Sequence, residues 1–95
     1  MKKAFRNRIK STITKCVEVR LLIIEKGRSK NSITWDQCKQ VIHEIELLQS
    51  DRQLINYLLE KQGLLRSMVP GPNQKMQKEL DQLILEATTY KTTKL

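Results

Sequence analysis

Residues 4–26 read AFRNRIKSTITKCVEVRLLIIEK, and the apolar side chains in this run recur every three or four positions. That spacing places them along one side of an α-helix. Arg20 falls inside the same stripe, so its guanidinium must reach solvent or find a buried partner. Gly27 is predicted to end the helix. The apolar positions on this side are Phe5, Ile9, Ile13, Cys16, Val17, Val19, Ile23 and Ile24.

A strand is the competing interpretation for part of this segment. The run from Val17 to Leu21 alternates apolar and polar side chains and contains β-branched residues, as strands do. No second run in the chain offers a pairing partner, and a lone strand would leave its backbone hydrogen bonds unmade. We therefore predict that the helix continues through these residues.

The helical period recurs downstream. A second helix is expected over residues 35–49 and a third over residues 51–62, which Gly63 should end. Each is preceded by a hydroxyl residue with glutamine three positions later, the spacing of a capping box. The two pairs are Thr34 with Gln37, next to the staple residue Ile33, and Ser50 with Gln53. The expected apolar faces are Trp35, Cys38, Val41, Ile42, Ile45 and Leu48, then Leu54, Ile55, Leu58, Tyr57 and Leu59.

The C-terminal part begins with a turn. Residues 64–73 include Pro70-Gly71-Pro72, and Asn73 can cap a last helix over residues 74–88. Residues 89–95 are expected to form a polar tail. The chain is thus predicted to be all-α, one domain over residues 1–88 built as a small bundle of three to four short helices. The expected face of the last helix is Met76, Leu80, Leu83, Ile84 and Ala87.

Positive charge is concentrated at the N-terminal end. Residues 1–30 hold ten Lys and Arg against two Glu, whereas residues 31–95 hold eight basic and eight acidic residues, and the formal net charge is +8. A segment of one charge sign indicates a polyanionic partner, either nucleic acid or an anionic membrane surface. Lys2 and Lys3 are the first two of these ten basic residues. The other eight are the candidate phosphate-contacting residues, namely Arg6, Arg8, Lys10, Lys15, Arg20, Lys26, Arg28 and Lys30. Polar neighbours that can add hydrogen bonds are Asn7, Ser11, Thr12 and Thr14.

These basic residues occupy two flanks of the expected helix. Lys3 and Lys10 share one flank, and Arg8, Lys15 and Lys26 share the other. A single phosphate path should use one flank together with the loop over residues 28–30. Four lysines in the charge-balanced part of the chain are expected to contribute little. They are Lys39, Lys61, Lys75 and Lys78.

The residues that enzymes need are sparse. His43 is the only histidine, and it follows Cys38 by five helical positions, which separates the two side chains by about 140°. A zinc site needs about four ligands, and no glycine cluster forms a phosphate-binding loop. We therefore expect neither catalysis nor a metal or cofactor. Two cysteines and no apolar run of about 20 residues suggest a reducing, cytoplasmic setting without a membrane span.

The first functional interpretation is a subunit that contacts the nucleic-acid backbone without reading sequence. In its 95-residue length, expected helical content and one-sided basic charge, the chain resembles the small helical subunit of CRISPR Cascade-type effector complexes. That resemblance implies a helical bundle lining a groove for the guide or the displaced strand. It also implies a role in antiviral defence and partner subunits within a larger ribonucleoprotein.

Two other interpretations remain open. A protein-binding adaptor or inhibitor, for example a phage-encoded one, would use apolar helix faces. Four leucines lie off the main stripes and would need cover of this kind. They are Leu21, Leu22, Leu47 and Leu64. The basic amphipathic first helix would also suit a membrane surface, although its stripe has no Trp and contains Arg20.

Overall fold

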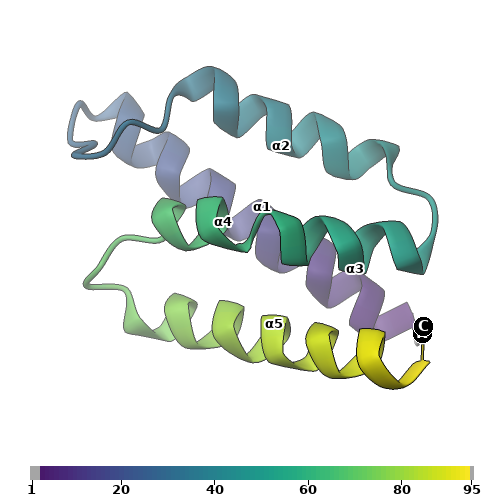
Figure 1. Ribbon diagram of the computed structural model, residues 1–95. Helices are drawn as coiled ribbons and strands as arrows, with labels where there is room; N and C mark the ends of the chain where they lie inside the picture. Colours follow the sequence, from purple (N-terminus) through teal and green to yellow (C-terminus); the bar gives the residue numbers. More distant parts are fainter. Residues whose placement is uncertain (1–2, 95) are drawn as a thin grey trace.

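The computed structural model describes residues 3–94 as five helices, with no strand in that range (Figure 1). The all-α prediction is confirmed, while the expected three to four helices are too few. The helices are α1 (Lys3–Glu25), α2 (Trp35–Leu47), α3 (Asp51–Glu60), α4 (Gln62–Met68) and α5 (Gln74–Lys94).

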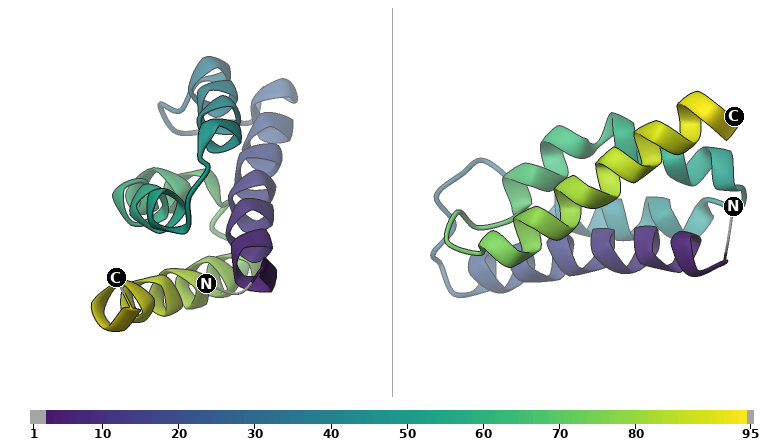
Figure 2. Two further views of the ribbon diagram at one scale, coloured as in Figure 1. Left: turned by 90° about the vertical axis from the view of Figure 1, so that its right-hand side faces the viewer. Right: turned by 90° about the horizontal axis from the view of Figure 1, so that it is seen from below.

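The long first helix contacts every other helix of the bundle. In Figure 1, α2, the α3–α4 pair and α5 lie one below another, and α1 passes behind them at an oblique angle. The side view in Figure 2 places α1 along one edge of this arrangement. Helix α1 packs against each of the other four helices, and α5 also packs against α3 and α4. One side of α1 therefore closes the core, and its opposite side stays exposed.

The buried side of α1 follows the stripe expected from the sequence. Ile9, Ile13, Cys16 and Val17 are fully buried, and the helix is continuous through the segment that also reads as a strand. Gly27 ends the helix in the left-handed region at φ 68°. Its N–H donates to the Ile24 carbonyl at 2.9 Å, and the next N–H donates to the Ile23 carbonyl at 3.0 Å. This pair of bonds is a Schellman motif.

The downstream helices begin where their caps predict. The Thr34 and Ser50 hydroxyls accept from the backbone N–H of Gln37 and Gln53, and both capping boxes are complete. The Asn73 side chain accepts from the Met76 N–H at 3.1 Å at the start of α5. Their apolar faces complete a core of aliphatic side chains around α1. The core from these helices and their connections is Ile33, Cys38, Val41, Ile45, Leu54, Ile55, Tyr57, Leu58, Leu65, Met68, Val69, Leu80, Leu83, Ile84 and Ala87.

The expected stop at Gly63 is wrong. Only Lys61 interrupts the helix between α3 and α4, and Gly63 lies inside α4. The N–H of Leu65 donates to the Lys61 carbonyl at 2.9 Å, so the backbone resumes helical bonding at once. Leu65 and Met68 are fully buried, and their burial outweighs the roughly 1 kcal/mol helix penalty of one glycine. The predicted loop is therefore shortened to the turn around Pro70.

The predicted tail is also helical, because α5 continues to Lys94. Tyr90 in this extension packs against the Phe5 ring, with centroids 6.1 Å apart, and so ties both ends of the described chain together. Thr88, Thr89, Thr92 and Thr93 each donate a hydroxyl bond to the carbonyl four residues earlier. Residue 95, the last of the expected tail, lies outside the described residues, as does Lys2.

Candidate nucleic-acid interface

The eight basic residues proposed from the sequence fall into three different environments. Arg20 is buried, with 6% of its surface exposed. Arg6 and Arg8 point toward acidic residues of other helices. The remaining five residues make no salt bridge with any residue between 3 and 94. These five are Lys10, Lys15, Lys26, Arg28 and Lys30.

The N-terminal turns of α1 carry arginines that are already neutralised. Arg6 donates from Nε to Asp51 Oδ1 at 2.9 Å, and this contact lowers the pKa of the Asp51 carboxyl. Arg8 forms a two-point pair with Glu86, from Nη2 to Oε2 at 2.7 Å and from Nη1 to Oε1 at 3.3 Å. The bond to Glu86 raises the pKa of the Arg8 guanidinium. Carboxylates from the charge-balanced residues 31–95 thus pair with arginines of the basic N-terminal segment in the folded chain.

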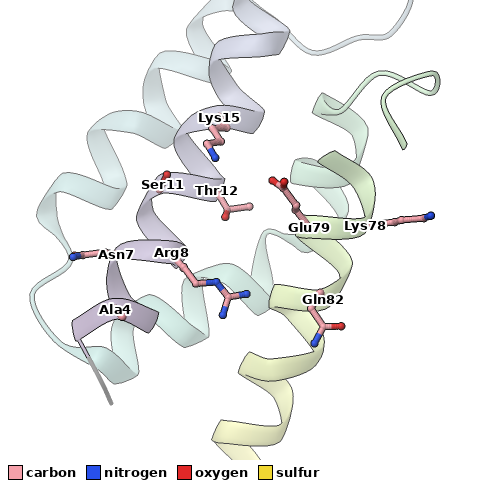
Figure 3. Close-up of a pocket in the computed structure, with 9 residues that line it drawn as sticks. All are labelled: Ala4, Asn7, Arg8, Ser11, Thr12, Lys15, Lys78, Glu79 and Gln82. Atoms are coloured by element: carbon pink, nitrogen blue, oxygen red, sulfur yellow. The ribbon is translucent and has the colours of Figure 1, made fainter. Parts of the chain in front are cut away.

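A polar groove lies between α1 and α5 beside this second pair (Figure 3). In Figure 3, Arg8 extends toward α5, Glu79 points toward α1, and Lys78 points away from the groove. The structure brings the predicted hydrogen-bonding residues Asn7, Ser11 and Thr12 to its wall. The full lining is Ala4, Asn7, Arg8, Ser11, Thr12, Lys15, Lys78, Glu79 and Gln82.

The groove alone is a poor polyanion site. Glu79 and Glu86 face the same edge of α1 as Arg8 and Lys15, so cations and carboxylates balance there. An incoming phosphate would have to displace Glu86 from Arg8 and approach Glu79. The groove also shows that Lys78 is not remote from the first helix, which its position in the sequence does not reveal.

The C-terminal half of α1 and the connection after it carry exposed cations that form no salt bridge with a described residue. Lys15 and Lys26 lie on the same exposed edge, 11 residues and therefore about 16 Å apart along the axis. Arg28 and Lys30 follow in the connection to α2, and both are exposed. We call Lys15, Lys26, Arg28 and Lys30 the basic surface. Lys10 is half-buried on the opposite flank, where Lys3 also lies, so these two residues do not share this edge.

The connection that carries Arg28 and Lys30 is held by the buried Arg20. Its Nε donates to the Met68 carbonyl at 3.0 Å and its Nη2 to the Ser67 carbonyl at 3.1 Å, while Nη1 lies 3.4 Å from the Ser29 hydroxyl. The guanidinium therefore bonds the last turn of α4, whose carbonyls have no helical N–H partner. It is a structural residue in this fold and is not placed to contact a phosphate.

Two more residues of the connection complete this network. Asn31 donates from Nδ2 to the Ser67 carbonyl at 2.9 Å, and its Oδ1 accepts from the Ile33 N–H at 3.2 Å. Ile33 is buried against the core. The basic connection is thus anchored by Gly27 at one end and by Ile33 at the other. A loop held in one conformation loses less entropy when it binds a ligand.

The thiols and the histidine do not converge. Cys38 is fully buried and His43 is exposed, so the two side chains lie on different sides of α2. Burial raises the pKa of the Cys16 thiol to about 11 and raises that of Cys38 as well. Such thiols stay protonated near neutral pH and are weak nucleophiles.

Residues 3–94 contain neither a metal-ligand cluster nor a membrane-spanning helix. No cluster of three or more His, Cys, Asp or Glu side chains in this range is arranged to hold a metal ion. None of the helices described here has the length and apolar character needed to cross a membrane.

Comparisons with known proteins do not place the chain in a family. No protein-family model, no curated protein and no solved structure matches it.

Proposed function

We propose that this chain is a non-catalytic nucleic-acid-binding subunit that holds the phosphate backbone without reading base sequence. One observation carries the proposal. The basic surface presents four exposed cations with no salt bridge to any described residue, whereas Arg6 and Arg8 at the other end of α1 are paired. Exposed like charges repel one another, and a polyanion relieves that repulsion while its condensed counterions are released.

The geometry supports contact with the backbone and not with base edges in a groove of DNA. The exposed residues of α2 include Glu46 and Asp36, whose carboxylates would face phosphates if this helix entered a major groove. A chain with so few free cations fits a role inside a larger cytoplasmic ribonucleoprotein. The resemblance to the small subunit of CRISPR Cascade-type complexes stays a prediction, and it would make such a complex the larger assembly.

The test is a binding titration at several salt concentrations. Fluorescence anisotropy of a labelled oligothymidylate about 16 nucleotides long would report affinity between about 50 and 200 mM salt. Four phosphate contacts predict a slope of log affinity against log salt of about −3 on single strands. Replacing Lys26, Arg28 and Lys30 together with Gln should bring the slope to about −0.7 and weaken binding at least tenfold at the lowest salt.

A matched variant controls for net charge. Arg52, Lys75 and Lys91 are also one arginine and two lysines, all exposed, on α3 and at the two ends of α5. Their replacement by Gln removes the same charge and should reduce affinity much less. Equal losses in the two variants would show that only overall charge matters. No salt-dependent binding by the unmodified chain would refute the proposal.

A protein-binding adaptor is the second candidate, and a different observation favours it. Leu22 and Leu47 are 53% and 62% exposed, and Leu85 is 61% exposed. Leu21 and Leu64, also expected to need cover, pack against the core. If the chain binds no oligonucleotide, replacing the three exposed leucines with Ser should abolish any protein association found in the native host without unfolding the bundle.

A further inference from the structure

Trp35 departs from its expected position. The helical period predicts it on the apolar face of the second helix, yet it is 42% exposed. The other aromatic side chains are better covered: Tyr57 is buried, and Phe5 and Tyr90 pack against each other and the core. The 42% of the residue that stays in water gains no burial energy, and it leaves part of the ring open to a ligand.

The backbone that carries the ring is held in place. Trp35 is the first residue of α2, and the capping box of Thr34 and Gln37 holds the backbone there. Buried Ile33 fixes the chain just before it. The indole is therefore presented from a rigid helix start at the same end of the molecule as the basic connection (Figure 1).

One cation lies over this ring, and two more precede it in the connection to α2. Lys39 Nζ lies 5.5 Å from the centroid of the Trp35 ring. Arg28 and Lys30 lie in the segment immediately before the helix, and both are exposed without a salt bridge to any described residue. A partly exposed aromatic ring at the same end of the molecule as exposed cations is the combination by which proteins hold single-stranded nucleic acid, since bases stack on the ring and phosphates meet the cations.

We propose that Trp35 is a stacking site for an unpaired base, which makes single-stranded nucleic acid the ligand of the basic surface. The inference rests on the proposed function and adds the ligand class to it. In a duplex the faces of the bases are covered by their neighbours, so a surface indole cannot stack on them without unstacking the helix. Lys39 then joins Arg28 and Lys30 as a phosphate contact, although its part of the sequence is charge-balanced. With this fifth contact the salt slope becomes about −3.5 for the unmodified chain and about −1.4 for the triple Gln variant.

The emission of Trp35 tests this directly, because it is the only tryptophan in the chain. Adding oligothymidylate should quench the emission and saturate at the concentration found by anisotropy. Inorganic polyphosphate, which offers the same charges without bases, should bind the basic surface and leave the emission nearly unchanged. A duplex of equal length should quench weakly.

Variants provide a second measure. Trp35→Ala should weaken single-strand binding about tenfold, as loss of one stacked base does elsewhere, and should change duplex binding little. Trp35→Phe keeps a ring and should retain most of the affinity. Leu47→Ala is the matched control, because it truncates an exposed apolar side chain near the other end of α2.

The outcomes separate the two proposals. Salt-dependent binding with unchanged Trp35 emission, or equal effects of Trp35→Ala and Leu47→Ala, would overturn base stacking and leave backbone binding standing. Equal weakening of single-strand and duplex binding by Trp35→Ala would overturn the single-strand assignment. Absence of any oligonucleotide binding would overturn both proposals.

Discussion

Replacement of Arg20 with Met should destabilise the bundle although it removes a charge from the interior. Arg20 donates to the carbonyls of Met68 and Ser67 at 3.0 and 3.1 Å. These carbonyls end α4, where the helix itself provides no donor. Methionine fits the apolar face of α1 but offers no hydrogen-bond donor, so the change isolates the contribution of the guanidinium.

The expected loss follows from these contacts. A bond from a charged donor contributes about 1.5–3 kcal/mol, so two of them set a gross loss of about 3–6 kcal/mol. Ser67 also accepts from Asn31 at 2.9 Å, so only the Met68 carbonyl is left without a side-chain donor. Methionine further removes the cost of keeping a charge out of water. We expect a net loss of about 2–4 kcal/mol in the free energy of unfolding.

Urea unfolding followed by far-ultraviolet circular dichroism measures this loss. The midpoint should fall by roughly 1–3 M, given the denaturant dependence of small proteins. Arg66→Met is the control, since Arg66 is 52% exposed and pairs with Asp81 at 3.1 Å on the surface. That pair should contribute less than about 1 kcal/mol. The urea midpoint of Arg20→Lys should lie between those of the unmodified chain and Arg20→Met, because an ammonium cannot reproduce the planar fork of donors on a guanidinium. Equal midpoints for the Arg20→Met and Arg66→Met variants would refute a structural role for Arg20.

Two further predictions concern charge and pH. Glu86→Gln should raise affinity for single strands about two- to fivefold at low salt by freeing Arg8 from an exposed pair. Asp81→Asn is the control, because it makes the same charge change outside the groove. An equal gain in affinity from both variants would show that net charge alone acts. Burial raises the pKa of Cys16 from 9.0 to about 11, so the unfolded chain loses this proton first and stability should fall as pH rises from 9 toward 11. Cys16→Ala should weaken that dependence of the urea midpoint on pH, and parallel profiles would contradict it.

Local signals explain why most of the fold is predictable from sequence. The Thr34 and Ser50 capping boxes, the Gly27 stop and the Asn73 cap depend on residues within one turn of each other. The apolar stripes depend only on the helical period. Both are visible without knowledge of any distant contact, and the structure confirms them.

The failures share a different cause, because each depends on contacts between distant residues. Gly63 is tolerated in a helix since Leu65 and Met68 are buried by other helices. Helix α5 extends past its expected end since Tyr90 meets Phe5, from the opposite end of the chain. Trp35 shares the period of the α2 face but lies where that face leaves the core. No pattern within a single segment encodes these contacts.

The candidate interface follows the same division. Counting charges along the chain locates the positive excess in residues 1–30 but cannot show which charges remain available. Folding brings Asp51 and Glu86 into salt bridges with Arg6 and Arg8 on the N-terminal turns of α1. No residue of the basic surface forms a salt bridge with a described residue, although Lys15 shares a groove with Glu79. The carboxylates of the charge-balanced residues 31–95 therefore determine which basic residues of the N-terminal segment stay available to a polyanion. A binding site of this kind depends on where folding places the acidic side chains as much as on where the basic residues lie in the sequence.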